Sequence, residues 1–287
     1  NWEFIEERRP KYVLVISGDH VYRMDYRALM LAHEQRGASV TIAVTRVPAE
    51  QSRRFGMVTL DRGGRVRAID EKPERSVASH ASMGIYLFDV ELLGEMLRHR
   101  PVDLVLDVLR PLVEAGERVY AHEFNGFWED VGTAESYYRA SLELVQPQPR
   151  FVMRDSRWPV LTRDEERPPV LLGDQAELRD SLVANGCRVN GTVERSILFP
   201  GAVVGKGAVV RDSVIMADST IEAGAVVEHA ILDKYVRVGE GARIGVGEPA
   251  AVPGLEWLAG LAIVGKDTWI PPGGVMERPS MVGIGGR

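Results

Sequence analysis

The second half of the chain carries branched aliphatic residues at intervals of six. The series is Ile197, Val203, Val209, Ile215, Ile221 and Val227. A small residue follows four places later in the first five repeats, at Gly201, Gly207, Ser213, Ser219 and Ala225. A helix repeats every 3.6 residues and a strand every two, so neither produces this period. A parallel β-helix does, because its three short strands per coil stack equivalent side chains at each corner. The period predicts a left-handed β-helix of hexapeptide repeats, with Val209 at a stacked corner.

The end of the repeat region is less regular. The phase slips at Asp233 and resumes at Val238 and Ile244. Residues 263–266 and Ile270 then predict a last coil. We therefore assign the β-helix domain to residues 176–287.

The first half of the chain alternates between strand-like and helix-like patterns. Residues 12–16 form a continuous apolar run, typical of a parallel strand buried on both faces. Asp25 can cap a helix that stops at Gly37, and residues 40–45 form the next strand, which gives a β-α-β unit. The other predicted elements are a hairpin of 57–60 and 65–69, strands at 85–88 and 118–124, and helices at 2–9, 90–98, 104–115 and 134–145.

These elements predict a mixed α/β sheet. Residues 1–146 are therefore assigned to one domain. Prolines at positions 147, 149, 159, 168 and 169 then interrupt both periodicities, so we place a linker at residues 147–175.

Composition limits the class of protein. Of 287 residues, 45% are hydrophobic, which is enough to fill more than one core. A net charge of -6 without a dense basic stripe argues against nucleic-acid binding and favours a small-molecule partner. The chain has no run of 18 apolar residues and no signal segment, so we expect a soluble cytoplasmic protein with no membrane partner. Cys187, the single cysteine, is expected to be buried and inert.

Two acidic residues follow strand-like segments. Asp19 stands in Ser17-Gly18-Asp19-His20, directly after the first predicted strand, and Asp130 lies between the 118–124 strand and a helix. In open α/β sheets, ligands bind beyond the carboxyl ends of strands. Two carboxylates there could hold a magnesium ion through oxygen ligands. Asp19 taken alone more simply caps a turn.

Two further segments have a functional and a structural interpretation. Glu71-Lys72-Pro73 ends the hairpin; Lys72 could bind phosphate, or form a solvated surface pair with Glu71. Ser82-Met83-Gly84 opens the next strand, where Gly84 would let a ligand approach the backbone or would mark a bulge.

Together these segments resemble the sugar-1-phosphate nucleotidyltransferases in order and spacing. Trp158-Pro159-Val160-Leu161-Thr162 also resembles the Trp-Pro-Ile-x-Thr signature of the glucose-1-phosphate adenylyltransferase (ADP-glucose pyrophosphorylase) family. The resemblance covers residues 11–245 and implies a Rossmann-like nucleotidyltransferase domain. The segments that carry it are 18–20, 71–73, 81–86 and 128–133.

The resemblance implies a reaction and a set of site residues. ATP and glucose 1-phosphate would give ADP-glucose and pyrophosphate for glycogen biosynthesis, without a covalent intermediate. Asp19 and Asp130 would be catalytic and would bind Mg²⁺. The protein would be a homo-oligomer, a tetramer as in the family. The implied substrate-binding residues are Glu71, Lys72, Ser82, Gly84 and Trp128.

The sequence departs from the family pattern at two points. Asp103 and Asp107 keep the acids of a segment that usually reads Asp-Phe-Gly-Lys-Asp, but the glycine and lysine are lost, which puts that lysine's role in doubt. The family's glycine-rich loop, which cradles the triphosphate, has no counterpart in these residues. We therefore expect a nucleotidyltransferase domain that is truncated at its N-terminus, and expect these residues alone to be inactive.

Three alternatives remain open. The protein could be a pyrophosphorylase that uses dTTP, GTP or UTP. It could be a catalytically silent regulatory or scaffolding subunit, although Asp19, Lys72 and Asp130 argue against this. The β-helix could be an acyltransferase, for which His229 is the one histidine available as a base in that domain.

Overall fold

The computed structural model describes residues 2–75, 78–153, 155–162, 165–249 and 258–283. It divides into two compact units, Asn1–Trp128 and Glu129–Arg287. The predicted linker at 147–175 lies within the second unit.

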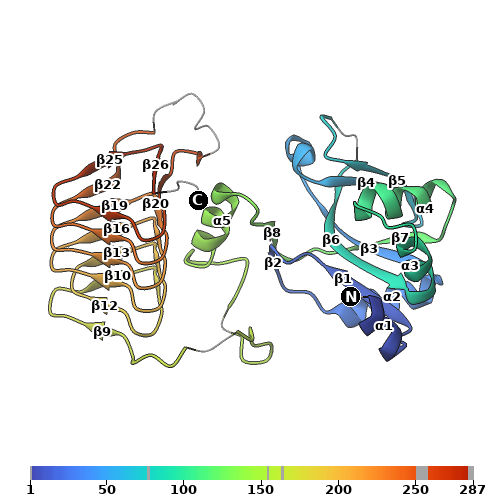
Figure 1. Cartoon of the computed structure of the whole chain (residues 1–287), viewed down its shortest axis with the longest axis horizontal. Helices are drawn as coiled ribbons and strands as arrows, with labels where there is room; N and C mark the ends of the chain where they lie inside the picture. The colour runs from blue at the N-terminus through green and yellow to red at the C-terminus, as the bar shows by residue number, and fades with distance from the viewer. Residues whose placement is uncertain (1, 76–77, 154, 163–164, 250–257, 284–287) are drawn as a thin grey trace. The chain divides into compact units, whose positions relative to one another are not determined.

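A six-stranded mixed sheet forms the core of the first unit (Figure 1). Its path is β5-β4-β6-β3-β7, and β1 also pairs with β6. β3 runs parallel to β7 and antiparallel to β6, and residues 40–44 of β3 are fully buried. The strands are β1 (Tyr12–Ile16), β3 (Val40–Arg46), β4 (Gly56–Leu60), β5 (Val66–Glu71), β6 (His80–Asp89) and β7 (Val119–Glu123).

Short helices and turns surround this sheet. The predicted helix after Asp25 is confirmed: the Asp25 side chain accepts a hydrogen bond from the Arg27 backbone N–H, and Gly37 ends the helix in the left-handed conformation. The helical elements are α1 (Trp2–Arg8), α2 (Tyr26–Arg36), the 3-10 helix η1 (Ala49–Arg54), α3 (Val90–Leu97), the π-helical η2 (Val105–Leu109) and α4 (Arg110–Glu114).

The predicted parallel, doubly buried strand at residues 12–16 is wrong. β1 pairs antiparallel with β6, and Ile16 is 51% exposed. The side chains of β1 alternate between two apolar clusters, one containing Val13 and Val15 and the other Tyr12 and Leu14. Because both faces meet apolar neighbours, the run is continuous although the strand is only half-buried.

The second unit contains a left-handed parallel β-helix of three six-stranded sheets (Figure 1). One sheet consists of β9 (Leu171–Leu172), β12 (Arg188–Val189), β15 (Val203–Val204), β18 (Thr220–Ile221), β21 (Arg237–Val238) and β24 (Trp269–Ile270). A second consists of β10 (Glu177–Arg179), β13 (Thr192–Glu194), β16 (Val209–Arg211), β19 (Val226–Glu228), β22 (Arg243–Val246) and β25 (Val275–Glu277). The third consists of β11 (Leu182–Val183), β14 (Ile197–Leu198), β17 (Val214–Ile215), β20 (Ala230–Leu232), β23 (Ala262–Val264) and β26 (Ser280–Val282).

The β-helix prediction is confirmed, but its phase is wrong in the earlier repeats. Val204 and Val210 are fully buried in the interior, whereas Val203 and Val209 are half-buried on the outer side. The interior positions are therefore spaced six, six and then five residues apart. They are Leu198, Val204, Val210, Ile215, Ile221, Val227, Leu232, Val238 and Ile244.

The five-residue interval has a local cause. At the corner between the second and third sheets, four successive coils turn through a single residue with positive φ. Arg195, Asp212 and His229 occupy this corner with φ of 44°, 44° and 47°. This tight turn removes one residue per coil, so Val210 pairs with Val227, 17 residues later.

The β-helix interior also contains Cys187, which is fully buried as expected, and burial raises the pKa of its thiol. Among the residues that the structure describes, no helix is both long enough and apolar enough to cross a membrane.

Candidate active site

Asp19 lies on a turn between β1 and the short strand β2 (His20–Tyr22). The Ser17 hydroxyl donates a 2.7 Å hydrogen bond to Asp19 Oδ1, and this bond lowers the pKa of the Asp19 carboxyl. The Asp19 side chain is 64% exposed. The turn therefore presents an ionised carboxylate to solvent at neutral pH.

His20 is held against the β6 strand beside Asp19. Its Nδ1 lies 2.9 Å from the Met83 carbonyl oxygen, and its Nε2 lies 3.7 Å from Asp19 Oδ1. Trp128 Nε1 lies 3.3 Å from the same nitrogen, so contacts with Met83 and Trp128 together hold the orientation of the ring. The sequence predicts no role for His20, because its contact with Met83 joins residues far apart in the chain.

Gly84 forms a bulge in β6, where the pairing with β3 shifts register between Ile42 and Val44. Its φ is +65°, and a Cβ atom there would lie 3.1 Å from Ser17 Cβ and 3.1 Å from His20 Cε1. The structure therefore gives Gly84 a packing function under the Asp19 turn.

Ser82 is buried beside this bulge. Its hydroxyl lies 3.1 Å from the Tyr86 hydroxyl and accepts a 3.3 Å hydrogen bond from the Gly84 N–H. The Ser82 side chain is thus already engaged within β6, and a role for Ser82 or Gly84 in substrate binding stays a prediction.

Glu71 and Lys72 end β5 and begin the following turn. Lys72 has φ of 44°, and its N–H donates to the Phe55 carbonyl oxygen at 3.2 Å. Its Nζ lies 3.6 Å from Glu71 Oε1, and its side chain is 63% exposed. The contact is long enough, and Lys72 exposed enough, for the ammonium group to be available to an anion.

Trp128 lies between His20, the neighbour of Asp19, and Phe55, the hydrogen-bond partner of Lys72. Its ring packs edge-on against His20 at a centroid distance of 5.2 Å and is tilted by 58° against Phe55 at 5.0 Å. His20 neighbours Asp19, and Phe55 is hydrogen-bonded to Lys72. Within the first unit, the predicted residues therefore form one connected set. Phe55 was missed from the sequence because its contact with Trp128 is also long-range.

Asp130 belongs to the second unit and ends the strand β8 (Trp128–Asp130). Its Oδ1 accepts a 2.8 Å hydrogen bond from the Gly132 N–H, just before Thr133 caps helix α5 (Ala134–Glu143). The approach of Asp19 and Asp130 to a common metal ion stays a prediction.

Asp103 and Asp107, the two acids of the segment that departs from the family pattern, accept hydrogen bonds from nearby backbone N–H groups. Asp103 Oδ1 accepts hydrogen bonds from the Val105 and Leu106 N–H groups, and Asp107 Oδ2 accepts from Val102 and Asp103. Both carboxylates therefore cap the start of η2.

The donor atoms of the candidate site suit magnesium. Mg²⁺ takes hard oxygen ligands and is commonly held by one or two carboxylates together with substrate phosphates. Among the residues described here, no three acidic, histidine or cysteine side chains are grouped to hold a metal ion. A metal bound by Asp19 and Asp130 would accordingly need further ligands from phosphate or water.

Comparison with known families agrees with this architecture. Residues 1–146 match the family model described as nucleotidyl transferase. Residues 171–251 match the model described as GlmU-like, C-terminal hexapeptide. The first match covers half of the chain, so this protein belongs to the nucleotidyl transferase family.

Proposed function

We propose that this protein transfers a nucleotidyl group to a sugar 1-phosphate, and that its substrates are ATP and glucose 1-phosphate. The product would be ADP-glucose for glycogen biosynthesis. The observation that carries the proposal is the connected set around Trp128, which joins an ionised Asp19 to an exposed Lys72 in a chain of the nucleotidyl transferase family. The choice of ATP and glucose rests on the resemblance of residues 158–162 to the adenylyltransferase signature.

The proposed reaction requires positioning and charge neutralisation. A phosphate oxygen of glucose 1-phosphate attacks the α-phosphorus of ATP; the bond from that phosphorus to the β-phosphate bridging oxygen breaks, and pyrophosphate leaves. Lys72 would bind the sugar phosphate, and Trp128 would form one wall of the pocket. Asp19 and Asp130 would hold Mg²⁺, which supplies electrophilic stabilisation of phosphate charge when bound.

Trp128 and Asp130 occupy alternate positions of β8. Side chains alternate along a strand, so Trp128 and Asp130 project from one face of β8 and Glu129 from the other. Trp128 packs on His20, the neighbour of Asp19. The strand therefore directs the Asp130 carboxylate to the same face as the Trp128 ring.

A nucleotide panel tests this proposal. The complete gene product that contains this chain is incubated with glucose 1-phosphate, Mg²⁺ and either ATP, UTP, GTP or dTTP, and NDP-glucose is quantified by chromatography. We expect ATP to be used at least about 10-fold faster than the other nucleotides, a preference of about 1.4 kcal/mol. Faster turnover with another nucleotide would reassign the substrate. No product with any of the four would favour the silent-subunit alternative.

A further inference from the structure

Helix α5 begins directly after the proposed metal ligand Asp130. The Asp130 carboxylate accepts the Gly132 N–H, and Thr133 and Ser136 form a reciprocal capping box at the helix start. These contacts leave little freedom between the end of β8 and the first turn of α5. The position of α5 therefore determines the position of the Asp130 backbone.

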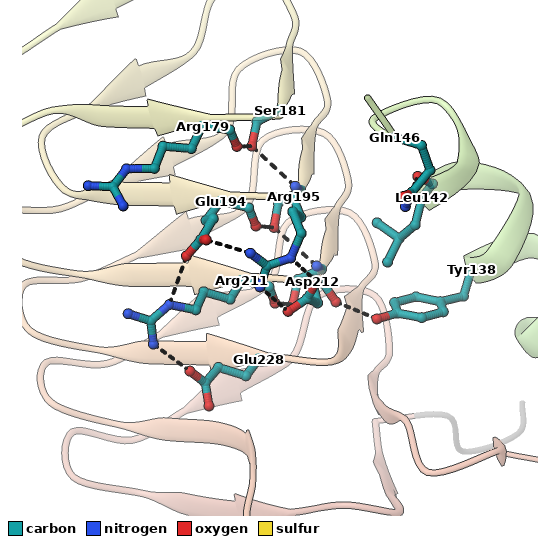
Figure 2. A network of polar contacts seen from close by, with 12 residues as sticks. Tyr138, Leu142, Gln146, Arg179, Ser181, Glu194, Arg195, Arg211, Asp212 and Glu228 are labelled. Atoms are coloured by element: carbon teal, nitrogen blue, oxygen red, sulfur yellow. Dashed lines mark hydrogen bonds and ion pairs between the residues drawn. The ribbon is translucent and has the colours of Figure 1, made fainter. Parts of the chain in front are cut away.

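The β-helix fixes the position of α5. Apolar side chains of the helix pack on outward-facing residues of the third sheet, and Val214 of that sheet is fully buried by the contact. The Tyr138 hydroxyl donates a 2.6 Å hydrogen bond to the Asp212 carbonyl oxygen (Figure 2). Burial raises the pKa of Tyr138, so the hydroxyl keeps its proton at neutral pH. The members of the apolar contact are Ala134, Tyr137, Tyr138, Leu142, Phe199, Val214, Met216, Ile231, Leu258, Leu261 and Ile263.

The corner at Asp212, whose carbonyl oxygen accepts the hydrogen bond from Tyr138, is itself held by ion pairs. Arg195 donates to both Asp212 carboxylate oxygens, at 2.7 and 2.8 Å. On the neighbouring outer face, Arg211 bridges Glu194 and Glu228 of the adjacent coils (Figure 2). The anchor for α5 is therefore a corner cross-linked to the coil before it, and not a single mobile side chain.

One residue of α5 also reaches back to β8. Arg139 forms an ion pair with Glu129, whose side chain is only 16% exposed, and its other terminal nitrogen lies 3.6 Å from Glu135. A carboxylate at this depth is destabilised if a charged partner is removed. Glu129 and Asp130 are consecutive in one strand. The ion pair of Arg139 with Glu129 therefore also sets the orientation of Asp130.

We infer that Arg139 is a positioning residue for the Asp130 carboxylate. Through Arg139 and α5, the β-helix takes part in metal binding at the transfer site. The inference rests on the proposed function, because it takes Asp130 as a metal ligand. Arg139 itself is not proposed to contact the metal or a substrate. Its effect is to hold β8 and α5 in one arrangement.

The test measures metal binding directly. Mn²⁺ is titrated into the complete gene product in the presence of ATP, and free Mn²⁺ is followed by its electron paramagnetic resonance signal. Arg139→Ala should raise the Mn²⁺ dissociation constant about 10-fold, as loss of an orienting partner does at other metal sites. It should also raise the Mg²⁺ concentration for half-maximal rate, while KM for glucose 1-phosphate changes less than about 2-fold. Arg179→Ala is the matched control, because Arg179 is 65% exposed and pairs with Glu177 on an outer face of the β-helix.

A conservative variant separates charge from a general loss of structure. Arg139→Lys keeps a positive charge opposite Glu129 and Glu135, and should hold the Mn²⁺ dissociation constant within about 3-fold of wild type. Unchanged Mn²⁺ binding in Arg139→Ala, or binding in Arg139→Lys that is as weak as in Arg139→Ala, would overturn the inference while leaving the proposed function standing. A wild-type protein with neither Mn²⁺ binding nor nucleotidyl transfer would overturn both.

Discussion

The backbone N–H of Ser17 donates a 3.0 Å hydrogen bond to the carbonyl oxygen of Gly84. The same glycine leaves no room for a side chain, because a Cβ atom would lie 3.1 Å from both Ser17 and His20. The turn that carries Asp19 therefore rests directly on the backbone of β6. Its conformation depends on the residue at position 84 as much as on its own sequence.

Replacing Gly84 by alanine should destabilise the first unit. The left-handed conformation costs an alanine about 1 kcal/mol, and the contacts with Ser17 and His20 should add at least about 1 kcal/mol. Gly116→Ala is the control, since Gly116 has φ of +75° but nothing within 4 Å of its Cβ position. Denaturant unfolding measures both losses. Equal losses would mean that the close approach to Ser17 contributes nothing.

Lys72→Ala should weaken binding of the sugar phosphate selectively. The Lys72 ammonium is 63% exposed and is expected to bind phosphate similarly in the ground and transition states. KM for glucose 1-phosphate should therefore rise about 10-fold or more, with a smaller change in kcat and in KM for ATP. Lys11→Ala, which removes an exposed ion pair with Glu34, is the control. A change confined to KM for ATP would place Lys72 at the triphosphate.

The phase of the β-helix can be tested with two neighbouring valines. Val210→Asp buries an unpaired charge between Val193 and Val227 and should cost several kcal/mol, on the order of 4 or more. Val209→Asp changes a half-buried residue on the outer side and should cost about 1 kcal/mol or less. The melting temperatures of the two variants show which valine faces the interior. A lower melting temperature for Val209→Asp would reverse the assigned phase.

The stability contributed by Arg167 should depend on pH. Its guanidinium donates to both oxygens of Asp218, at 2.6 and 3.0 Å, and this ion pair lowers the pKa of the Asp218 carboxyl below 3.8. A carboxyl with a depressed pKa adds stability above its unfolded pKa, and that stability is lost as the pH falls through the folded pKa. Arg167→Met should thus lower the melting temperature by about 1–3 °C at pH 7 and by less near pH 2.

The control for this pH dependence is Arg157→Met. Arg157 is 91% exposed, and its contact with Asp155 is 3.6 Å, so its removal should leave the melting temperature nearly unchanged at both pH values. A loss for Arg167→Met that is the same at pH 7 and pH 2 would assign the effect to packing instead of charge.

Local sequence patterns were sufficient for much of the fold. Asp25 and Gly37 bound α2 as predicted, because caps act through backbone groups one to three residues away. The period of six revealed the β-helix. Its phase could not be read, because the five-residue corner is occupied by Arg195, Asp212 and His229, none of which is the glycine that usually marks a positive φ.

The candidate site was only partly predictable from the sequence, because its contacts join residues far apart in the chain. Asp19 and Lys72 stand at strand ends, and this position can be recognised from the sequence. The contacts that connect them run through His20, Phe55 and Trp128, which approach one another only after the sheet has formed. The contact of β1 with β6 was likewise not predicted, because an apolar run does not reveal the direction of its partner strand.

The assignment of nucleotidyl transfer to this site is tested by comparing the rate of the wild-type protein with that of Asp19→Asn. The complete gene product is supplied with ATP, glucose 1-phosphate and saturating Mg²⁺, and ADP-glucose and pyrophosphate are measured together. The wild-type protein should form the two products in equal amounts, and Asp19→Asn should lower kcat about 100-fold or more. Asp130→Asn should do the same. A near-normal kcat in Asp19→Asn, or no ADP-glucose from the wild-type protein, would contradict the assignment of this site to nucleotidyl transfer.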